Sequence, residues 1–222
     1  MNETKKTVEH GDFVEIDFKG MTKEGRVFDT TKAEIAKEND FFNPEAEYKP
    51  KIICIGEGHV LRGIDEQLIG KGIGKNYTIE LESEKAFGKK TAKLLKLIPL
   101  LVFKKQKIEV VPGLQIVMDG TLATIKNVTG GRVIVDFNHP LAGQDIIYEV
   151  EVKKILTETK EKLEALMEIY LNTKDFEVII TEKKAEIKLK QKTPEEANDL
   201  LGKEIKRLIP ELEQVVITEK KV

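Results

Sequence analysis

Alternating apolar and polar residues in the first part of the chain predict β-strands around one short helix. Residues 12–20 and 76–83 alternate with a period of two, which is typical of strands that bury one face. Residues 51–56 form a short, continuously apolar run that ends at a glycine and predicts another strand. Between these strands, residues 59–69 place apolar side chains at helical spacing, and the glycines of residues 70–74 end that helix.

The middle of the chain is also predicted to be β-rich, and it is the most apolar part. Turns at Pro112-Gly113 and Gly130-Gly131 separate its apolar runs, and the second turn favours a hairpin. After the hairpin, residues 145–155 return to the alternating pattern of the first part. The runs that we assign to this β-rich part are 93–105, 107–111, 114–118, 122–128 and 132–137.

The last part of the chain has a different pattern. Residues 159–171 carry apolar side chains on one helical face, and residues 176–180 and 185–189 predict a hairpin. Residues 193–196 (Thr-Pro-Glu-Glu) combine an N-cap, an N1 proline and an N3 glutamate, which predicts a second helix. With a final strand at 214–218, the predicted order is α-β-β-α-β.

Charge divides the chain in the same places as the pattern does. Residues 89–137 carry nine basic and three acidic groups, a net charge of +6, whereas residues 158–222 carry 13 and 15, a net charge of -2. The remainder, 1–88 with 138–157, carries 15 and 21, a net charge of -6. A shift in both charge and hydropathy indicates a domain boundary, so we predict three domains with these limits.

Composition removes several classes of protein. No apolar run is long enough to cross a bilayer, and the N-terminal residues have no apolar core of a secretory signal, so we expect a cytoplasmic protein with no membrane partner. Cys54 is the single cysteine, which excludes a disulfide framework, and the three histidines are far apart. We therefore expect no metal and no cofactor. Many Lys and Glu residues with no Trp are typical of thermophilic proteins.

Five runs of residues resemble the FKBP-type peptidyl-prolyl cis-trans isomerases in their order, spacing and glycines. The resemblance covers about half the chain, and the insertion before its last run is similar to the SlyD-like subgroup, in which a chaperone domain interrupts the flap. The whole resembles the long archaeal members, which add a C-terminal domain. The runs are IDFKG (16–20), GRVFDTT (25–31), IGEGHVLRGIDEQLIGKGIGK (55–75), EKAFGKK (84–90) and NHPLAGQDIIYEVEV (138–152).

The resemblance implies an α+β fold. Residues 1–88 with 138–157 are expected to form an FKBP-like antiparallel sheet wrapped on a short helix. Residues 89–137 are expected to form a β-rich insert-in-flap domain, and residues 158–222 a small α/β domain. Insertion at a loop tip is tolerated because the entropy cost of closing a loop rises slowly with its length.

The resemblance also implies the site residues. Phe18 and Phe87 stand where the family commonly has tyrosine, Ile64 replaces a tryptophan, and Lys51 replaces an aromatic residue. The residues expected to be catalytic are Phe28, Asp29, Phe87 and Tyr148, and those expected to bind substrate are Phe18, Val60, Leu61, Ile64 and Leu141.

Such residues suit the catalysis of amide rotation. Resonance holds a peptide bond planar with a barrier of about 18–20 kcal/mol, and an X–Pro bond exchanges in tens to hundreds of seconds. An apolar pocket disfavours the polar planar amide relative to the twisted one. The backbone N–H of Leu61 is expected to hold a substrate carbonyl, and Asp29 to orient the substrate rather than to act as a base.

The apolar run at the start of the insert has two interpretations. It packs the core of the insert, or it is exposed and binds unfolded chains, with the net charge of +6 attracting acidic segments. A client held there would present its prolines to the pocket at a high effective concentration. The residues expected to bind clients are Leu97, Ile98, Leu100, Leu101, Val102 and Phe103.

The expected partners are unfolded or nascent polypeptides with X–Pro bonds, together with a second copy of the chain bound through residues 158–222. Two other functions stay open from the sequence. The first is a non-catalytic holdase that binds polypeptides without accelerating rotation. The second is a ribosome- or RNA-associated protein built around the basic insert, although the insert has few aromatic residues and Arg132 alone among arginines, so nucleic acid is not expected.

Overall fold

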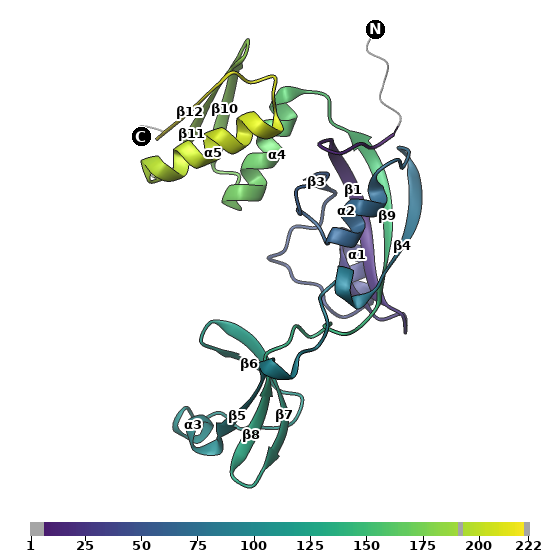
Figure 1. Cartoon of the computed structure of the whole chain (residues 1–222), viewed down its shortest axis with the longest axis vertical. Helices are drawn as coiled ribbons and strands as arrows, with labels where there is room; N and C mark the ends of the chain where they lie inside the picture. Colours follow the sequence, from purple (N-terminus) through teal and green to yellow (C-terminus); the bar gives the residue numbers. More distant parts are fainter. Residues whose placement is uncertain (1–6, 191–192, 220–222) are drawn as a thin grey trace. The chain divides into compact units, whose positions relative to one another are not determined.

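The computed structural model describes residues 7–190 and 193–219, and the chain divides into two compact units (Figure 1). The first unit contains the residues up to Gly20, the segment Val27–Ile79 and the residues from Tyr148 onward. The second unit contains Met21–Arg26 and Glu80–Ile147. The limits of the three predicted domains stay predictions.

The first unit is built on a five-stranded sheet. The strand order is β2-β1-β9-β4, and β3 pairs with the first residues of β1 in antiparallel register, with Phe13 opposite Cys54. The elements are β1 (Phe13–Thr22), β2 (Val27–Thr30), α1 (Ala33–Glu38), β3 (Lys51–Cys54), α2 (Arg62–Leu68), β4 (Lys75–Leu81) and β9 (Ile146–Ile155).

Alternation along β1 and β9 decides which side chains form the core of this sheet. Helix α2 lies across one face of the sheet (Figure 1), and it buries Ile64 and Leu68. Every second residue of β1 and β9 is buried, as expected for a strand with one face in a core. These buried residues are Val14, Ile16 and Phe18 on β1, and Ile146, Tyr148, Val150 and Val152 on β9.

The C-terminal segment, residues 159–219, has the element order that the pattern predicts. Strands β10 and β11 pair antiparallel, and β12 pairs parallel to β11. The core of this segment is continuous with Phe13 and Cys54 of the sheet, because they belong to one buried cluster with Leu163, Leu166 and Met167. The elements are α4 (Thr159–Leu171), β10 (Phe176–Thr181), β11 (Lys184–Leu189), α5 (Glu195–Leu208) and β12 (Gln214–Glu219).

Helix α5 begins differently from the prediction. The pattern made Thr193 the N-cap, but the helix begins at Glu195 with Pro194 in the cap position and no side-chain cap. The Thr193 hydroxyl donates to Asn198 Oδ1 at 2.5 Å and makes no cap hydrogen bond.

The insert, residues 89–137, forms an antiparallel four-stranded sheet in the order β5-β8-β7-β6. A buried cluster of Phe103, Ala123, Ile125, Val133 and Val135 forms its core. The elements of the second unit are the 3₁₀ turns η1 (Ser83–Lys85) and η2 (Ala92–Leu94), then β5 (Leu95–Pro99), α3 (Leu100–Lys105), β6 (Gln115–Met118), β7 (Thr121–Thr129) and β8 (Arg132–Asp136).

The apolar run at 93–105 is not one β-rich stretch. Strand β5 ends at Pro99, which has no N–H to continue a ladder, and residues 100–105 form α3. The helix closes with Lys107 in the left-handed region (φ 57°) and the Ile108 N–H donating to Phe103 O at 3.0 Å. Residues 107–111 then form no strand, although the pattern placed one there. Across the described residues, no helix is long and apolar enough to cross a membrane.

Candidate active site

Three of the predicted aromatic residues meet on the sheet of the first unit. The ring of Tyr148 on β9 contacts Phe18 on β1 edge to face, with centroids 5.7 Å apart, and Phe28 on β2 in the same manner at 5.9 Å. Phe18 and Tyr148 are buried, whereas Phe28 is half-buried. We call these three rings the aromatic cluster, and Phe28 is the ring of the cluster with the most surface exposed.

Tyr148 joins the aromatic cluster to Asp29. Its hydroxyl donates to Asp29 Oδ2 at 2.9 Å. Burial, the negative charge of Asp29 and this hydrogen bond all raise the pKa of Tyr148 above its ordinary value. Tyr148 is therefore a neutral donor at physiological pH, and one oxygen of Asp29 is fixed at the edge of an apolar set of rings.

The position of this hydroxyl explains one departure of the sequence. Phe18 lacks the hydroxyl that the resemblance leads one to expect, but its neighbour on the adjacent strand supplies a hydroxyl that reaches Asp29. A side chain at Gly20 would stop this, because an added Cβ would lie 2.7 Å from Tyr148 Cζ and 2.9 Å from Cε1. Gly20 therefore makes room for the tyrosine.

Threonine side chains hold the strand that carries Phe28 and Asp29. The Thr30 hydroxyl donates to Phe18 O at 3.0 Å, and the Phe18 N–H donates to Thr31 Oγ1 at 3.0 Å. The Thr31 hydroxyl in turn donates to the buried Asp17 at 2.7 Å. These bonds fix β2 beside Phe18, so that the backbone positions both Phe28 and Asp29.

Lys51 lies against the buried ring of Phe18. Its Nζ is 5.4 Å from the ring centroid, which is within the range of a cation–π contact. The lysine that replaces an aromatic residue at this position therefore uses its charge against the ring.

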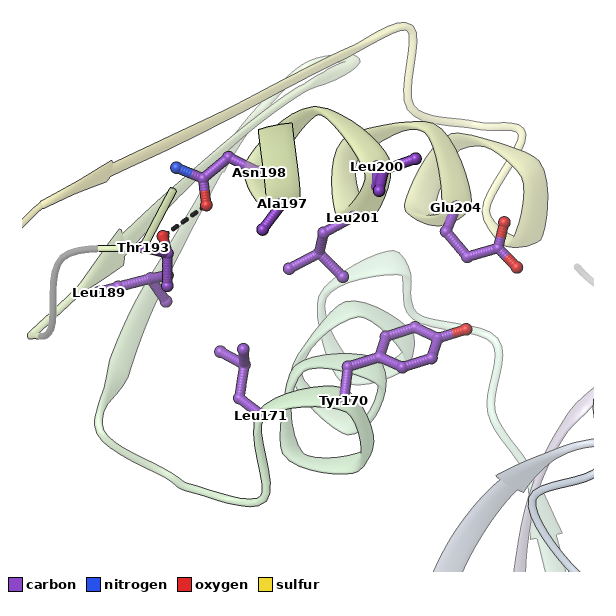
Figure 2. A pocket seen from close by; sticks show the side chains of 9 residues that line it. All are labelled: Tyr170, Leu171, Leu189, Thr193, Ala197, Asn198, Leu200, Leu201 and Glu204. Atoms are coloured by element: carbon purple, nitrogen blue, oxygen red, sulfur yellow. Dashed lines mark hydrogen bonds between the residues drawn. The ribbon is translucent and has the colours of Figure 1, made fainter. Parts of the chain in front are cut away.

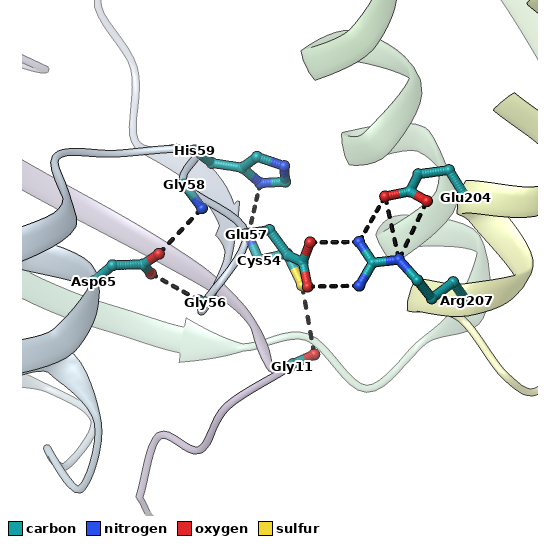
Figure 3. Close-up of polar contacts among 9 residues, drawn as sticks. All are labelled: Gly11, Cys54, Gly56, Glu57, Gly58, His59, Asp65, Glu204 and Arg207. Atoms are coloured by element: carbon teal, nitrogen blue, oxygen red, sulfur yellow. Dashed lines mark hydrogen bonds and ion pairs between the residues drawn. The ribbon is translucent and has the colours of Figure 1, made fainter. Parts of the chain in front are cut away.

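The loop of residues 55–61 carries Val60 and Leu61 into α2. The carboxylate of Asp65, on α2 and buried, accepts from Gly56 N at 2.9 Å and from Gly58 N at 3.2 Å (Figure 3). Both glycines have positive φ, so a side chain would be strained at either position. Asp65 thus fixes the turn that delivers Val60 and Leu61.

Val60 and Leu61 themselves are half-buried, and Ile64 is 3% exposed beneath α2. Within the described part of the chain, the Leu61 N–H has no hydrogen-bond acceptor. Ile64, like Phe18 and Tyr148, is buried.

The other two predicted residues belong to the second unit. Phe87 stacks on His139 with centroids 4.2 Å apart and an interplanar angle of 7°. Leu141 is buried, and its N–H donates to His139 Nδ1 at 3.2 Å. The two chain segments that lead into and out of the insert are joined by Gly143 N–H donating to Gly88 O at 2.8 Å. His139 thus orders this connection, and burial lowers its pKa.

The residues predicted to bind clients divide into exposed and buried groups. Leu97 is 52% exposed on β5, and Leu101 and Val102 are exposed on α3, whereas Ile98 and Leu100 pack partly against the core. Phe103 is completely buried in that core, so a client cannot reach it, and we assign it to the core and not to a client-binding surface.

Sequence reasoning missed exposed apolar residues elsewhere on the insert. Val117 on β6 is 72% exposed and pairs across the ladder with the exposed Leu122 on β7. Both lie on the face opposite to the core, because their neighbours Ile116 and Ala123 pack inside. The period-two alternation of these strands could have found them, since apolar residues occur at both the inner and the outer positions.

Sequence reasoning also missed a polar contact at the 55–61 loop. Glu57 accepts a two-pronged hydrogen bond from Arg207 on α5 (Figure 3), 150 residues away in sequence. No local pattern contains a signal for such a long-range pair. In residues 7–190 and 193–219, no group of three or more His, Cys, Asp or Glu side chains is arranged to hold a metal ion.

Comparison with known proteins gives consistent matches. The model of the FKBP26 IF domain family matches residues 96–141. The chain is 34% identical over 148 residues to a short-type peptidyl-prolyl cis-trans isomerase of Methanocaldococcus jannaschii. The aligned region covers 67% of this chain and 94% of that protein. It is 29% identical over 131 residues to the FKBP-type 16 kDa peptidyl-prolyl cis-trans isomerase of Escherichia coli K12 (57% and 83% covered). It is 31% identical over 113 residues to the FKBP-type isomerase SlyD of Vibrio cholerae (49% and 55% covered).

Proposed function

Because the chain belongs to the FKBP-type peptidyl-prolyl cis-trans isomerases, we propose that its aromatic cluster, with Asp29 and the 55–61 loop, is where rotation about X–Pro bonds is accelerated. The observation that carries this proposal is the Tyr148 hydrogen bond to Asp29 beside Phe28, since it joins an apolar surface to one fixed carboxylate. Family membership favours catalysis over binding alone.

The proposed mechanism needs no bond to break. The proline ring rests on Phe28 and Val60, where water is excluded and the planar amide loses the solvation that stabilises its charge separation. The twisted amide has less charge separation, so it is favoured relative to both planar forms. The substrate gains from this environment only during rotation, which lowers the barrier.

Two polar groups would fix the substrate while its amide rotates. The Leu61 N–H is available to donate to a substrate carbonyl, because it has no acceptor among the described residues. Asp29 is held by Tyr148 and orients the substrate backbone, and it moves no proton because the reaction transfers none. On the basis of the resemblance, Phe87 stays a proposed catalytic residue and Leu141 a proposed substrate contact.

A short-peptide isomerisation assay with Phe28→Ala tests this proposal. A proline–aromatic contact worth about 1–1.5 kcal/mol corresponds to a fall of about tenfold in kcat/KM. Phe28→Leu retains apolar volume and is expected to fall less. Unchanged kcat/KM in Phe28→Ala, with the fold intact by circular dichroism, would contradict the assignment of the site.

We also propose that the insert holds unfolded clients. The support is the exposed apolar surface of Leu97, Leu101, Val117 and Leu122 on a segment with net charge +6. The exposed residues of β6 and β7 add to the predicted residues of β5 and α3, and β8 lies between β5 and β7 in the sheet. The proposed clients are unfolded or nascent polypeptides in the cytoplasm.

Suppression of client aggregation tests the role of this surface. Val117→Ser removes an exposed apolar side chain, and Gln115→Ser, on the same face of β6, is the matched control because it removes no apolar surface. Weaker suppression by Val117→Ser and by Leu97→Ser, but not by the control, is expected. Equal suppression by all variants would mean that this face does not bind clients.

The C-terminal segment is proposed to pair two copies of the chain. An apolar groove of about 410 Å³ lies between α4 and α5 (Figure 2), with Leu171 and Leu201 facing one another across it. Leu200 and Tyr170 line the groove and are 67% and 40% exposed, so they add accessible apolar surface there. Sedimentation of Leu200→Lys is expected to show half the mass of the unaltered chain, and equal masses would contradict pairing here.

A further inference from the structure

The 55–61 loop, which carries Val60 and Leu61, is held both by neighbouring residues in the sequence and by the C-terminal segment. Asp65 and the glycines hold it from α2, and the Cys54 N–H donates to His59 Nδ1 at 3.0 Å. The backbone of Ile55 exchanges hydrogen bonds with Gly11 and Asp12, and further contacts come from the C-terminal segment, which shares a buried core with Cys54 and Phe13. The loop therefore lies between the sheet and helices that are distant in sequence.

Arg207 makes the strongest of these outer contacts. Its Nη1 donates to Glu57 Oε1 at 3.0 Å, and its Nη2 donates to Glu57 Oε2. Its Nε and Nη2 also donate to Glu204 on the same helix, at 3.1 and 2.6 Å (Figure 3). Planar two-pronged pairing fixes direction as well as distance, so Glu57 is oriented and not merely attracted.

The surroundings of the pair strengthen it. Glu57 is 15% exposed and Arg207 is 50% exposed, so water screens the glutamate side of the pair less than in an ordinary surface pair. The hydrogen bonds from Arg207 lower the pKa of Glu57, which stays ionised. Two residues along the loop, His59 packs edge to face on Tyr170 of α4, with centroids 6.2 Å apart. Both helices of the C-terminal segment thus touch the loop.

We infer that Arg207 and Glu57 are positioning residues for the isomerase site, through which the C-terminal segment sets the place of Val60 and Leu61. This inference rests on the proposed function, because it requires those two residues to contact substrate. The pair touches no substrate itself. The pair restricts the conformations of the loop, so a smaller entropy cost of ordering the loop is incurred when the peptide binds.

The expected effect is on substrate binding more than on the rotation step. Loss of a partly exposed pair is worth at most about fivefold, so Arg207→Ala is expected to raise KM for a short proline peptide about two- to fivefold, with kcat within about twofold. Arg207→Lys keeps the charge but loses the planar guanidinium group, so its KM is expected to lie between those of the unaltered chain and Arg207→Ala. Lys206→Ala, the neighbouring residue on α5, is the matched control and should leave KM unchanged.

A charge exchange separates positioning from a general loss of structure. In the double variant Glu57→Arg with Arg207→Glu, the pair is rebuilt in reverse, so KM should return towards that of the unaltered chain. Added salt should raise KM of the unaltered chain towards that of Arg207→Ala. If Arg207→Ala does not fold, Glu57→Gln gives the same comparison from the loop side.

Three results would overturn the inference: an unchanged KM in Arg207→Ala, a loss in kcat alone, or a failure of the exchange to restore KM. Phe28→Ala is measured in parallel. If Phe28→Ala lowers kcat/KM while Arg207→Ala changes nothing, the positioning role is wrong and the site stands. If Phe28→Ala has no effect, the site itself is wrong.

Discussion

Replacement of Gly20 by alanine tests the packing on which the candidate site depends. The added Cβ would lie 2.7 Å from Tyr148 Cζ, 2.9 Å from Cε1 and 3.1 Å from the hydroxyl oxygen. The backbone of Gly20 is not in the left-handed region, so alanine meets no conformational strain there. Alanine also lowers the conformational entropy of the unfolded chain, which stabilises the protein by about 0.4–1 kcal/mol, so any loss of stability must come from displacement of the tyrosine ring.

The size of the effect follows from two contributions. Overpacking a buried site costs typically about 1–3 kcal/mol. A displaced ring also loses its hydrogen bond to Asp29, and a buried hydroxyl without a partner costs about 1–3 kcal/mol. Because the ring can shift to relieve part of the clash, we expect Gly20→Ala to lower the free energy of unfolding by about 2–4 kcal/mol. Isomerase activity on short peptides should fall as well, since Tyr148 no longer fixes Asp29.

A double-mutant cycle with Tyr148→Val makes this test specific. Valine is too short to reach the added Cβ, so Gly20→Ala should cost little stability in that background. Urea unfolding followed by circular dichroism measures all four proteins, and a loss of this size shifts the midpoint by about 1 M. If Gly20→Ala costs the same in both backgrounds, or below about 0.5 kcal/mol in the first, the close approach of Gly20 and Tyr148 is not what positions the ring.

Three further predictions concern the hydroxyl, the insert and pH. Tyr148→Phe keeps the aromatic cluster but removes the donor to Asp29, so kcat/KM for peptides should fall while the free energy of unfolding drops by about 1–3 kcal/mol, and an unchanged kcat/KM would show that the hydroxyl plays no part. Val117→Lys, at a 72% exposed position, should alter unfolding by under about 0.5 kcal/mol but weaken the binding of an unfolded client in a fluorescence titration, and unaltered affinity would argue against this face. Burial lowers the pKa of His59, so the unfolded chain takes up the proton at a higher pH than the folded chain does. The stability that His59 contributes is complete above its ordinary pKa of 6.5 and is lost as the pH falls below that value. The urea midpoint, measured at several pH values, should therefore decline less steeply with falling pH in His59→Asn than in the unaltered chain. Parallel profiles for the two proteins would contradict this role of His59.

Local pattern predicted the elements well where one face of a strand or helix is buried. Residues 159–171 form α4 with those bounds, and β1 and β9 show the alternation of their sequences. It failed at residues 100–105, because a continuous apolar run does not distinguish a strand from a short helix, and Pro99 ends the strand. It also failed at residues 107–111, which follow the left-handed Lys107 at the end of that helix and form no strand.

The candidate site was only partly predictable for a related reason. The resemblance named Phe18, Phe28, Asp29 and Tyr148, and the structure brings these four together. It did not indicate that Tyr148 supplies the hydroxyl that Phe18 lacks, since this depends on which side chains of neighbouring strands reach Asp29. The contact of Glu57 with Arg207 was beyond reach of the sequence, because it depends on how the C-terminal segment packs against the sheet.

The most direct test of the account compares two substrates: a short proline peptide, and an unfolded protein whose refolding is limited by proline isomerisation. Phe28→Ala should lower kcat/KM for both substrates by a similar factor, because the proposed site acts on every X–Pro bond. Val117→Ser combined with Leu97→Ser should lower kcat/KM for the protein and leave the peptide unchanged. Two results would contradict the division of binding and catalysis between the two surfaces. One is an insert variant that loses as much activity on the peptide as on the refolding protein. The other is full activity of Phe28→Ala on both substrates.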